Sequence, residues 1–218
     1  MIYDRLIEPQ KTAVLIIDVQ NDYCSEKGKV AVSRKLDVKP VQKMVRRLNR
    51  FLKSARIFQL PVIFVRMDKD KRKVANNLKL KLKSLIFPFS ESLCIPGTWG
   101  FEYYKLKPIE KDIEIIKCSY DAFSNPQLEQ TLTKLAVENL IITGVYSEIC
   151  VDATLKSAFL KGYNIIVPED LVSTTKESED KQKIIMSLWT DFFAYAVKSK
   201  KIIRRWNQQN SSKKLYKQ

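Results

Sequence analysis

Runs of consecutive apolar residues alternate with stretches of helical character along most of this chain. The runs at 12–20, 61–66, 112–117, 139–144, 163–168 and 194–199 are typical of strands buried on both faces of a parallel sheet. The segments 38–56, 125–137, 150–162 and 177–193 carry the spacing or the end signals of helices. Strands that alternate with helices predict an α/β fold with a mostly parallel, doubly wound sheet.

Polar residues that could take part in catalysis stand where these apolar runs end. Asp18 ends the first run, Lys117 ends the third, and the turn after the fourth leads to Cys150. In doubly wound sheets, sites form outside the carboxyl ends of the strands. We therefore expect Asp18, Lys117 and Cys150 to meet at one edge of the sheet.

These three residues suit nucleophilic catalysis. Cys150 opens a predicted helix, whose dipole favours a thiolate, although a buried structural cysteine fits its position equally well. Lys117 is either a group that stabilises negative charge or a surface lysine at a strand end. Asp18 is a helix cap, a salt-bridge partner or a catalytic group. Because the chain contains no histidine, Asp18 is the candidate acceptor of the thiol proton.

Composition narrows the class of protein. The 218 residues include 39 Lys and Arg against 24 Asp and Glu, a net charge of +15. An anionic partner such as nucleic acid or a membrane surface is one interpretation. We favour a lysine-rich cytoplasmic protein without such partners, because much of the excess lies in a basic segment at 68–85 and in the tail at 198–218. The four cysteines form no CxxC pair, which argues against structural zinc.

Four segments carry a resemblance that is specific in combination: LIIDVQNDY (15–23), PGTWG (96–100), IIKCSYDAF (115–123) and ITGVYSEICVDATLKSAFLKGYNIIVPED (142–170). With the frame of strands and helices over about 10–199, they resemble the isochorismatase-like cysteine hydrolases. That family includes N-carbamoylsarcosine amidase, nicotinamidase and isochorismatase. We therefore expect a hydrolase domain over 1–200, with a basic insertion at about 67–95, followed by a basic polar tail at 201–218, of which we expect the last dozen residues to be mobile.

The resemblance implies a three-layer α/β/α fold with a six-stranded sheet and an Asp18–Lys117–Cys150 triad. Asp18 would take the thiol proton, and Cys150 would attack an amide or carbamoyl carbonyl to form a thioester. The resemblance also implies a cis peptide between Val145 and Tyr146, with the amides of Tyr146 and Cys150 as oxyanion donors. It further implies a homo-oligomer, a dimer or tetramer, for which Phe101, Tyr103 and Tyr104 are candidate interface residues.

Departures from the family pattern point to one reaction among several. Many nicotinamidases hold a metal through histidines, which this chain lacks, so we expect no metal and no cofactor and interpret Asp68 as a solvated loop charge. Cys150 favours acyl chemistry. We expect a metal-independent, N-carbamoylsarcosine amidase-like cysteine amidohydrolase of small amides. The alternatives are a vinyl-ether hydrolase of the isochorismatase type, a nicotinamidase, or a catalytically silent binding protein with a basic surface.

The substrate pocket is predicted to be largely aromatic. Aromatic residues stand beside each of the motifs, and each of them fits a core position as well as a pocket wall. Gln20 is a candidate hydrogen-bonding group around Asp18 or the substrate. The candidate pocket residues are Gln20, Tyr23, Trp99, Tyr120 and Phe123.

Overall fold

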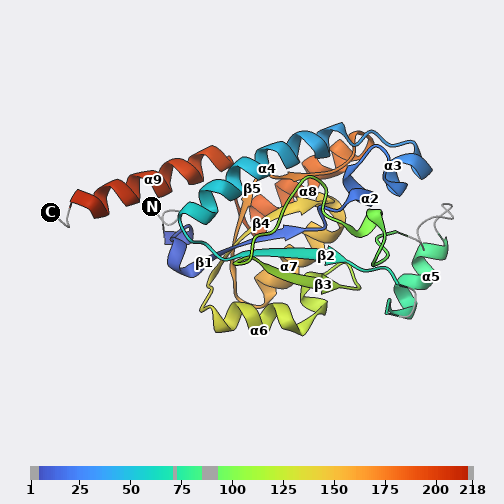
Figure 1. The fold of residues 1–218 in the computed structure, drawn as a ribbon, viewed down its shortest axis with the longest axis horizontal. Coiled ribbons are helices and arrows are strands. Elements are labelled where there is room, and N and C mark those ends of the chain that lie inside the picture. Colours follow the sequence, from blue (N-terminus) through green and yellow to red (C-terminus); the bar gives the residue numbers. More distant parts are fainter. Residues whose placement is uncertain (1–4, 71–72, 85–92, 216–218) are drawn as a thin grey trace.

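A computed structural model describes residues 5–70, 73–84 and 93–215. A parallel sheet of seven strands runs through it in the order β3-β2-β1-β4-β5-β7, with β6 paired to β4 (Figure 1). Every strand pair is parallel. The strands are β1 (Thr12–Ile17), β2 (Val62–Met67), β3 (Ile113–Lys117), β4 (Asn139–Val145), β5 (Asn164–Pro168), β6 (Val172–Ser173) and β7 (Tyr195–Val197).

The predicted α/β fold with a doubly wound parallel sheet is confirmed. The six predicted strands are present, and β6 is a seventh that the pattern did not reveal. It has two residues, which continue the pairing of β4 through Gly144 with Val172 and Val145 with Ser173. A strand this short gives no apolar run of its own.

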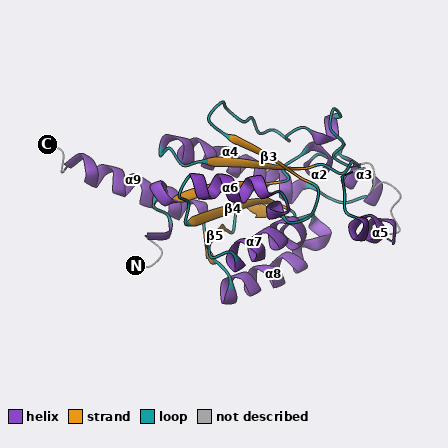
Figure 2. Ribbon diagram, turned by 90° about the horizontal axis from the view of Figure 1, so that it is seen from below, coloured by secondary structure: helices purple, strands orange, loops and turns teal. Residues whose placement is uncertain are grey.

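Helices cover both faces of the sheet. Helix α4 (Lys39–Ile57) lies on one face and α6 (Pro126–Lys134) on the other (Figure 1). Helices α7 (Asp152–Leu160) and α8 (Glu179–Phe192) run side by side on the same side as α6 (Figure 2). The Trp189 indole of α8 donates a hydrogen bond to Asp152 of α7 at 2.9 Å. Because both faces are covered, all six residues of β1 are buried.

Short elements gather beyond the carboxyl ends of the strands. They are α2 (Asn21–Cys24), α3 (Lys29–Arg34) and α5 (Asn76–Ser84), at the right of Figure 1. Helix α5 lies within the predicted basic insertion, part of which, 85–92, falls outside the described residues. The elements at this edge surround the predicted site.

The last helix, α9 (Ser199–Leu215), runs across the boundary expected at residue 200 and makes most of the predicted tail helical. Trp206 is only 1% exposed, and its ring lies 5.4 Å from that of Phe51 and 5.6 Å from that of Phe58. Its indole N–H also donates to the Ile7 carbonyl at 2.7 Å. Trp206, together with the fully buried Ile202, therefore anchors a helix whose other residues are mostly polar.

The three candidate interface residues make packing contacts within the chain. Phe101 and Tyr104 are buried. The ring of Tyr103 lies 5.1 Å from the ring of Phe64, and the Arg66 guanidinium lies 4.6 Å from the Tyr103 centroid. Within the described ranges, no helix has both the length and the apolar character needed to cross a bilayer.

Candidate active site

The close approach of β1 and β4 sets the frame of the site. Ile17 pairs with Gly144 in register, and a Cβ on Gly144 would lie 2.2 Å from the Ile17 carbonyl oxygen. Gly144 also has a φ of +117°, which side chains rarely adopt. Asp18, the residue after Ile17, has a φ of 53°, so the chain turns sharply as it leaves β1. These turns bring Asp18 next to the segment that carries Cys150.

Asp18 and Lys117 form a buried ion pair. The distance between Asp18 Oδ2 and Lys117 Nζ is 2.8 Å, and the two side chains are 1% and 0% exposed. Lys117 Nζ also donates to the carbonyls of Ser119 at 2.9 Å and Tyr120 at 3.0 Å. Burial lowers the pKa of Lys117, but Asp18 and Cys150 outweigh burial and the net direction is upward. Lys117 is therefore a fixed cation.

Asp18 keeps capacity to accept a proton. Within the described part of the chain, neither of its carboxylate oxygens accepts a well-aligned hydrogen bond, although Lys117 lies within ion-pair distance. The Asp18 carboxylate also interacts with the Cys150 thiol. A buried carboxylate beside a thiol is placed to receive the thiol proton.

Cys150 lies in a π-helical turn, Ser147–Val151, that leads into α7. It is 6% exposed and forms part of a cavity wall. Burial raises the pKa of the thiol to about 12, with Lys117 acting to lower it and Asp18 to raise it. Burial of Cys150 therefore opposes the thiolate that a helix dipole alone would favour. The peptide between Val145 and Tyr146, immediately before this turn, is cis.

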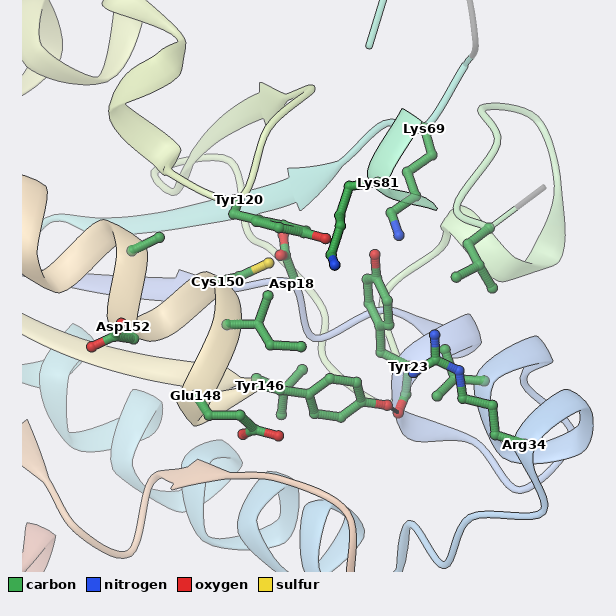
Figure 3. A pocket seen from close by; sticks show the side chains of 15 residues that line it. Asp18, Tyr23, Arg34, Lys69, Lys81, Tyr120, Tyr146, Glu148, Cys150 and Asp152 are labelled. Carbon is green, nitrogen blue, oxygen red and sulfur yellow. Dashed lines mark hydrogen bonds between the residues drawn. The ribbon is translucent and has the colours of Figure 1, made fainter. Parts of the chain in front are cut away.

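A cavity of about 540 Å³ opens beside these groups (Figure 3). Three tyrosines line it, Tyr23, Tyr120 and Tyr146. The rings of Tyr23 and Tyr146 meet edge to face at 5.7 Å, and the Tyr146 hydroxyl donates to the Tyr23 carbonyl at 2.6 Å. The cavity wall also carries charged side chains: Arg34, Lys69, Lys81, Glu148 and Asp152.

Three candidate pocket residues lie elsewhere. Gln20 is fully buried, and its amide bonds to backbone groups of Met67 and Phe101, so it fastens loops together. Trp99 is 52% exposed on a short 3-10 turn. Phe123 packs against Tyr163 with the ring centroids 5.9 Å apart. Their positions next to the sequence motifs did not reveal which of the candidate residues line the cavity.

Asp68 is not the solvated charge expected from its loop position. It is fully buried, with Oδ2 2.6 Å from Lys73 Nζ and Oδ1 accepting from the Asp70 N–H at 2.9 Å. Strand β2 ends one residue earlier, and the Asp68 N–H still bonds to the Lys117 carbonyl at 2.8 Å. Among the described residues, no three His, Cys, Asp or Glu side chains form a group that fits a metal ion.

Sequence reasoning missed Lys69, which lines the cavity and is 6% exposed. It belongs to a run of charged residues, DKDKRK at 68–73, where nothing separates a buried lysine from solvated ones. The available signal was its position two residues after the apolar strand β2, at the edge where sites form.

Comparison with known proteins places this geometry in a family. The Isochorismatase domain model matches residues 12–199. The chain belongs to the isochorismatase family. A ureidoacrylate amidohydrolase, RutB, of Pantoea ananatis is 28% identical over 173 residues, which is 74% of this chain and 69% of the relative.

Solved structures share the fold of this isochorismatase family member. A cysteine hydrolase from Pseudomonas syringae pv. phaseolicola has a TM-score of 0.81 at 21% identity, covering 93% of this chain and 95% of its own. The N-carbamoylsarcosine amidase from Thermoplasma acidophilum has a TM-score of 0.69 at 20% identity, covering 87% and 96%. The expected family resemblance is confirmed.

Proposed function

We propose that this chain is a metal-independent cysteine amidohydrolase that cleaves a small amide or carbamoyl substrate. One observation carries the proposal. A buried Asp18 carboxylate, paired with Lys117 at 2.8 Å, interacts with a Cys150 thiol in the wall of a cavity. This arrangement supplies a nucleophile, a proton acceptor and a fixed positive charge without histidine.

The reaction follows from these three groups. Asp18 takes the thiol proton as the Cys150 sulfur bonds to the carbonyl carbon, and Lys117 balances the negative charge that develops. The intermediate collapses when Asp18 returns the proton to the leaving nitrogen and the C–N bond breaks. Water, giving a proton to Asp18, then attacks the thioester and releases the acid, after which the proton returns to Cys150.

The oxyanion of the intermediate needs hydrogen-bond donors. Tyr146 directly precedes the helical turn, and Cys150 lies within it. Backbone N–H groups in the first turn of a helix lack intrahelical partners and point toward its start. We assign the amides of Tyr146 and Cys150 to this role, which makes the attacked oxygen a ligand of the same turn that carries the nucleophile.

The names of the similar proteins favour a carbamoyl substrate. Ureidoacrylate amidohydrolase and N-carbamoylsarcosine amidase are both named for substrates that carry a carbamoyl group on nitrogen. The cavity wall carries three basic side chains, Arg34, Lys69 and Lys81, beside the acidic Asp18, Glu148 and Asp152, and these cations offer partners to a small anionic molecule that neutral nicotinamide would not use. We therefore rank a ureido compound first, above nicotinamide and above a vinyl ether.

Release of ammonia and amine from the amides, and of pyruvate from the vinyl ether, tests the proposal on three substrate classes. Purified protein is assayed with 3-ureidopropionate, nicotinamide and isochorismate, as wild type and as Cys150→Ala, Asp18→Asn and Cys118→Ala. We expect ureido hydrolysis, a loss of at least about 1000-fold in the first two variants, and little change in the third. Full activity of Cys150→Ala on isochorismate would instead establish vinyl-ether hydrolysis. No activity on any amide would refute the amidohydrolase.

We also propose that the enzyme works as a homo-oligomer, a dimer or tetramer, in the cytoplasm. Apolar side chains at Ile184, Leu188 and Phe192 are 64%, 39% and 66% exposed and recur every four residues along α8. All four cysteines are free thiols, which suits a reducing compartment. Light scattering on the wild type and on Ile184→Lys measures the mass of the assembly.

A further inference from the structure

Lys69 is a buried cation that the proposed reaction does not use. It lines the cavity that holds Cys150 and is 6% exposed. Its Nζ lies 5.8 Å from the centroid of the Tyr23 ring. Figure 3 shows the ends of Lys69 and Lys81 pointing toward the same space above Tyr23, with Cys150 across from Lys69 in this view. Lys69 therefore points into the cavity rather than toward the protein core.

The surroundings of Lys69 give its charge little compensation. Lys117 is as deeply buried, but it has a carboxylate and two carbonyls as acceptors. Lys69 Nζ has neither an ion pair nor a hydrogen bond within the described residues, and the face of Tyr23 is its contact there. Burial accordingly lowers the pKa of Lys69. Because Lys69 faces the cavity without an acceptor among the described residues, an anion bound in the cavity would supply the partner that this ammonium lacks.

The acidic side chains of the cavity wall have other partners: Asp18 pairs with Lys117, and Asp152 with Lys156 and Trp189. Glu148 is engaged by the hydroxyls of Thr174 at 2.8 Å and Ser147 at 3.0 Å. Arg34 and Lys81 line the same cavity and add positive charge to it. Lys69 also lies near enough to lower the pKa of the Cys150 thiol. Since Lys69 and Cys150 line the same cavity, one small molecule could place an anionic group at Lys69 and a carbonyl at Cys150.

We propose that Lys69 binds a carboxylate of the substrate and thereby selects amides or carbamoyl compounds that carry an anionic group near the scissile carbonyl. The inference rests on the proposed function, because it takes Cys150 as the point of attack. The substrate carboxylate supplies the acceptor that Lys69 lacks, so the energy of that pairing is gained on binding.

Binding to a non-reacting protein tests this assignment separately from catalysis. In the Cys150→Ala background, calorimetry measures the Kd of 3-ureidopropionate and of its neutral methyl ester, with and without Lys69→Met. Lys69→Gln serves as a second neutral variant if Lys69→Met fails to fold. Lys69→Arg keeps the charge, and Lys53→Met, an exposed lysine on α4, controls for the loss of one positive charge.

We expect Lys69→Met to weaken binding of the acid by about 10- to 100-fold and that of the ester by less than about twofold. Lys69→Arg should retain most of the preference, and Lys53→Met all of it. The melting temperature of Lys69→Met should equal or exceed that of its parent, because an unpaired buried charge has been removed. Equal loss for acid and ester, no loss for either, or no binding of the acid would overturn the assignment.

Steady-state kinetics keeps the two proposals apart. If wild type hydrolyses acid and ester with equal kcat/KM, and Lys69→Met does the same, the amidohydrolase stands and the role of Lys69 fails. If the acid binds through Lys69 but neither compound is cleaved, the anion site stands and the proposed reaction fails.

Discussion

Replacing Asp18 with asparagine separates two explanations of how Cys150 becomes a nucleophile. The pKa of Cys150 is raised to about 12 by burial first and also by Asp18, while Lys117 acts to lower it. Asp18→Asn keeps the shape of the side chain and removes the negative charge that opposes a thiolate. We expect the variant to lose amide hydrolysis, since its proton acceptor is gone, and nevertheless to be alkylated faster at Cys150.

The size of the effect follows from the charge that is removed. Two unit charges about 4 Å apart interact by about 4 kcal/mol at an effective dielectric constant of about 20, which is about three pKa units. The thiolate fraction at pH 8 would then rise about 1000-fold. A Brønsted slope of about 0.45 lowers the reactivity of each thiolate about 20-fold. The expected net increase in the alkylation rate is about 50-fold.

The assay is iodoacetamide labelling from pH 6 to 9, followed at each cysteine by peptide mass spectrometry. Cys118 is the internal control, because its pKa is raised by burial and then by Asp68, with no contribution from Asp18. The reasoning is refuted if Cys150 of a folded Asp18→Asn protein reacts at the wild-type rate or more slowly. That result would mean that the carboxylate maintains a thiolate in the resting enzyme.

Two further substitutions test how the site is supported. Gly144→Ala should lower the free energy of unfolding by about 3–5 kcal/mol, since its Cβ would meet the Ile17 carbonyl at 2.2 Å and its φ is +117°. Gly162→Ala, with φ +91° and nothing within 4 Å, should lose only about 1–2 kcal/mol in the same urea titration, and equal losses would exclude the close approach as the cause. Trp206→Ala should lose about 3–5 kcal/mol, because a buried indole and its hydrogen bond to Ile7 disappear. The exposed Lys200→Ala serves as its control, and a loss below about 1 kcal/mol for Trp206→Ala would contradict the packing of α9.

Strand positions and strand ends were predictable because they depend on local patterns. The apolar run before Asp18 and that before Lys117 placed both residues at one edge of a parallel sheet, where the structure brings them to 2.8 Å. The burial of Lys69 and of Asp68 was not predictable, since both lie in a charged run whose exposure is decided by distant segments.

The packing of Trp206 and the hydrogen bonds of Gln20 were also not predictable from the sequence patterns. Trp206 fixes a polar helix through contacts with Phe51, Phe58 and the Ile7 backbone, all more than 100 positions away in the chain. Gln20 stands beside Asp18 in sequence, but its amide finds three backbone partners and turns away from the cavity. Motif spacing identifies which residues are near the chemistry and leaves the direction of each side chain to packing.

Because β1 and β4 pair in register, the lengths of these two strands set the position of Asp18 relative to Cys150. Asp18, the proposed proton acceptor, leaves one strand directly after Ile17, and the turn that carries Cys150, the proposed nucleophile, leaves the neighbouring strand just after Gly144. One residue inserted into β1 would move every later side chain of that strand to the opposite face of the sheet. The insertion would also shift Asp18 out of its position beside Lys117. Mutational drift in this enzyme should therefore accept apolar exchanges along β1 and reject insertions and deletions there, even where the sheet itself still assembles.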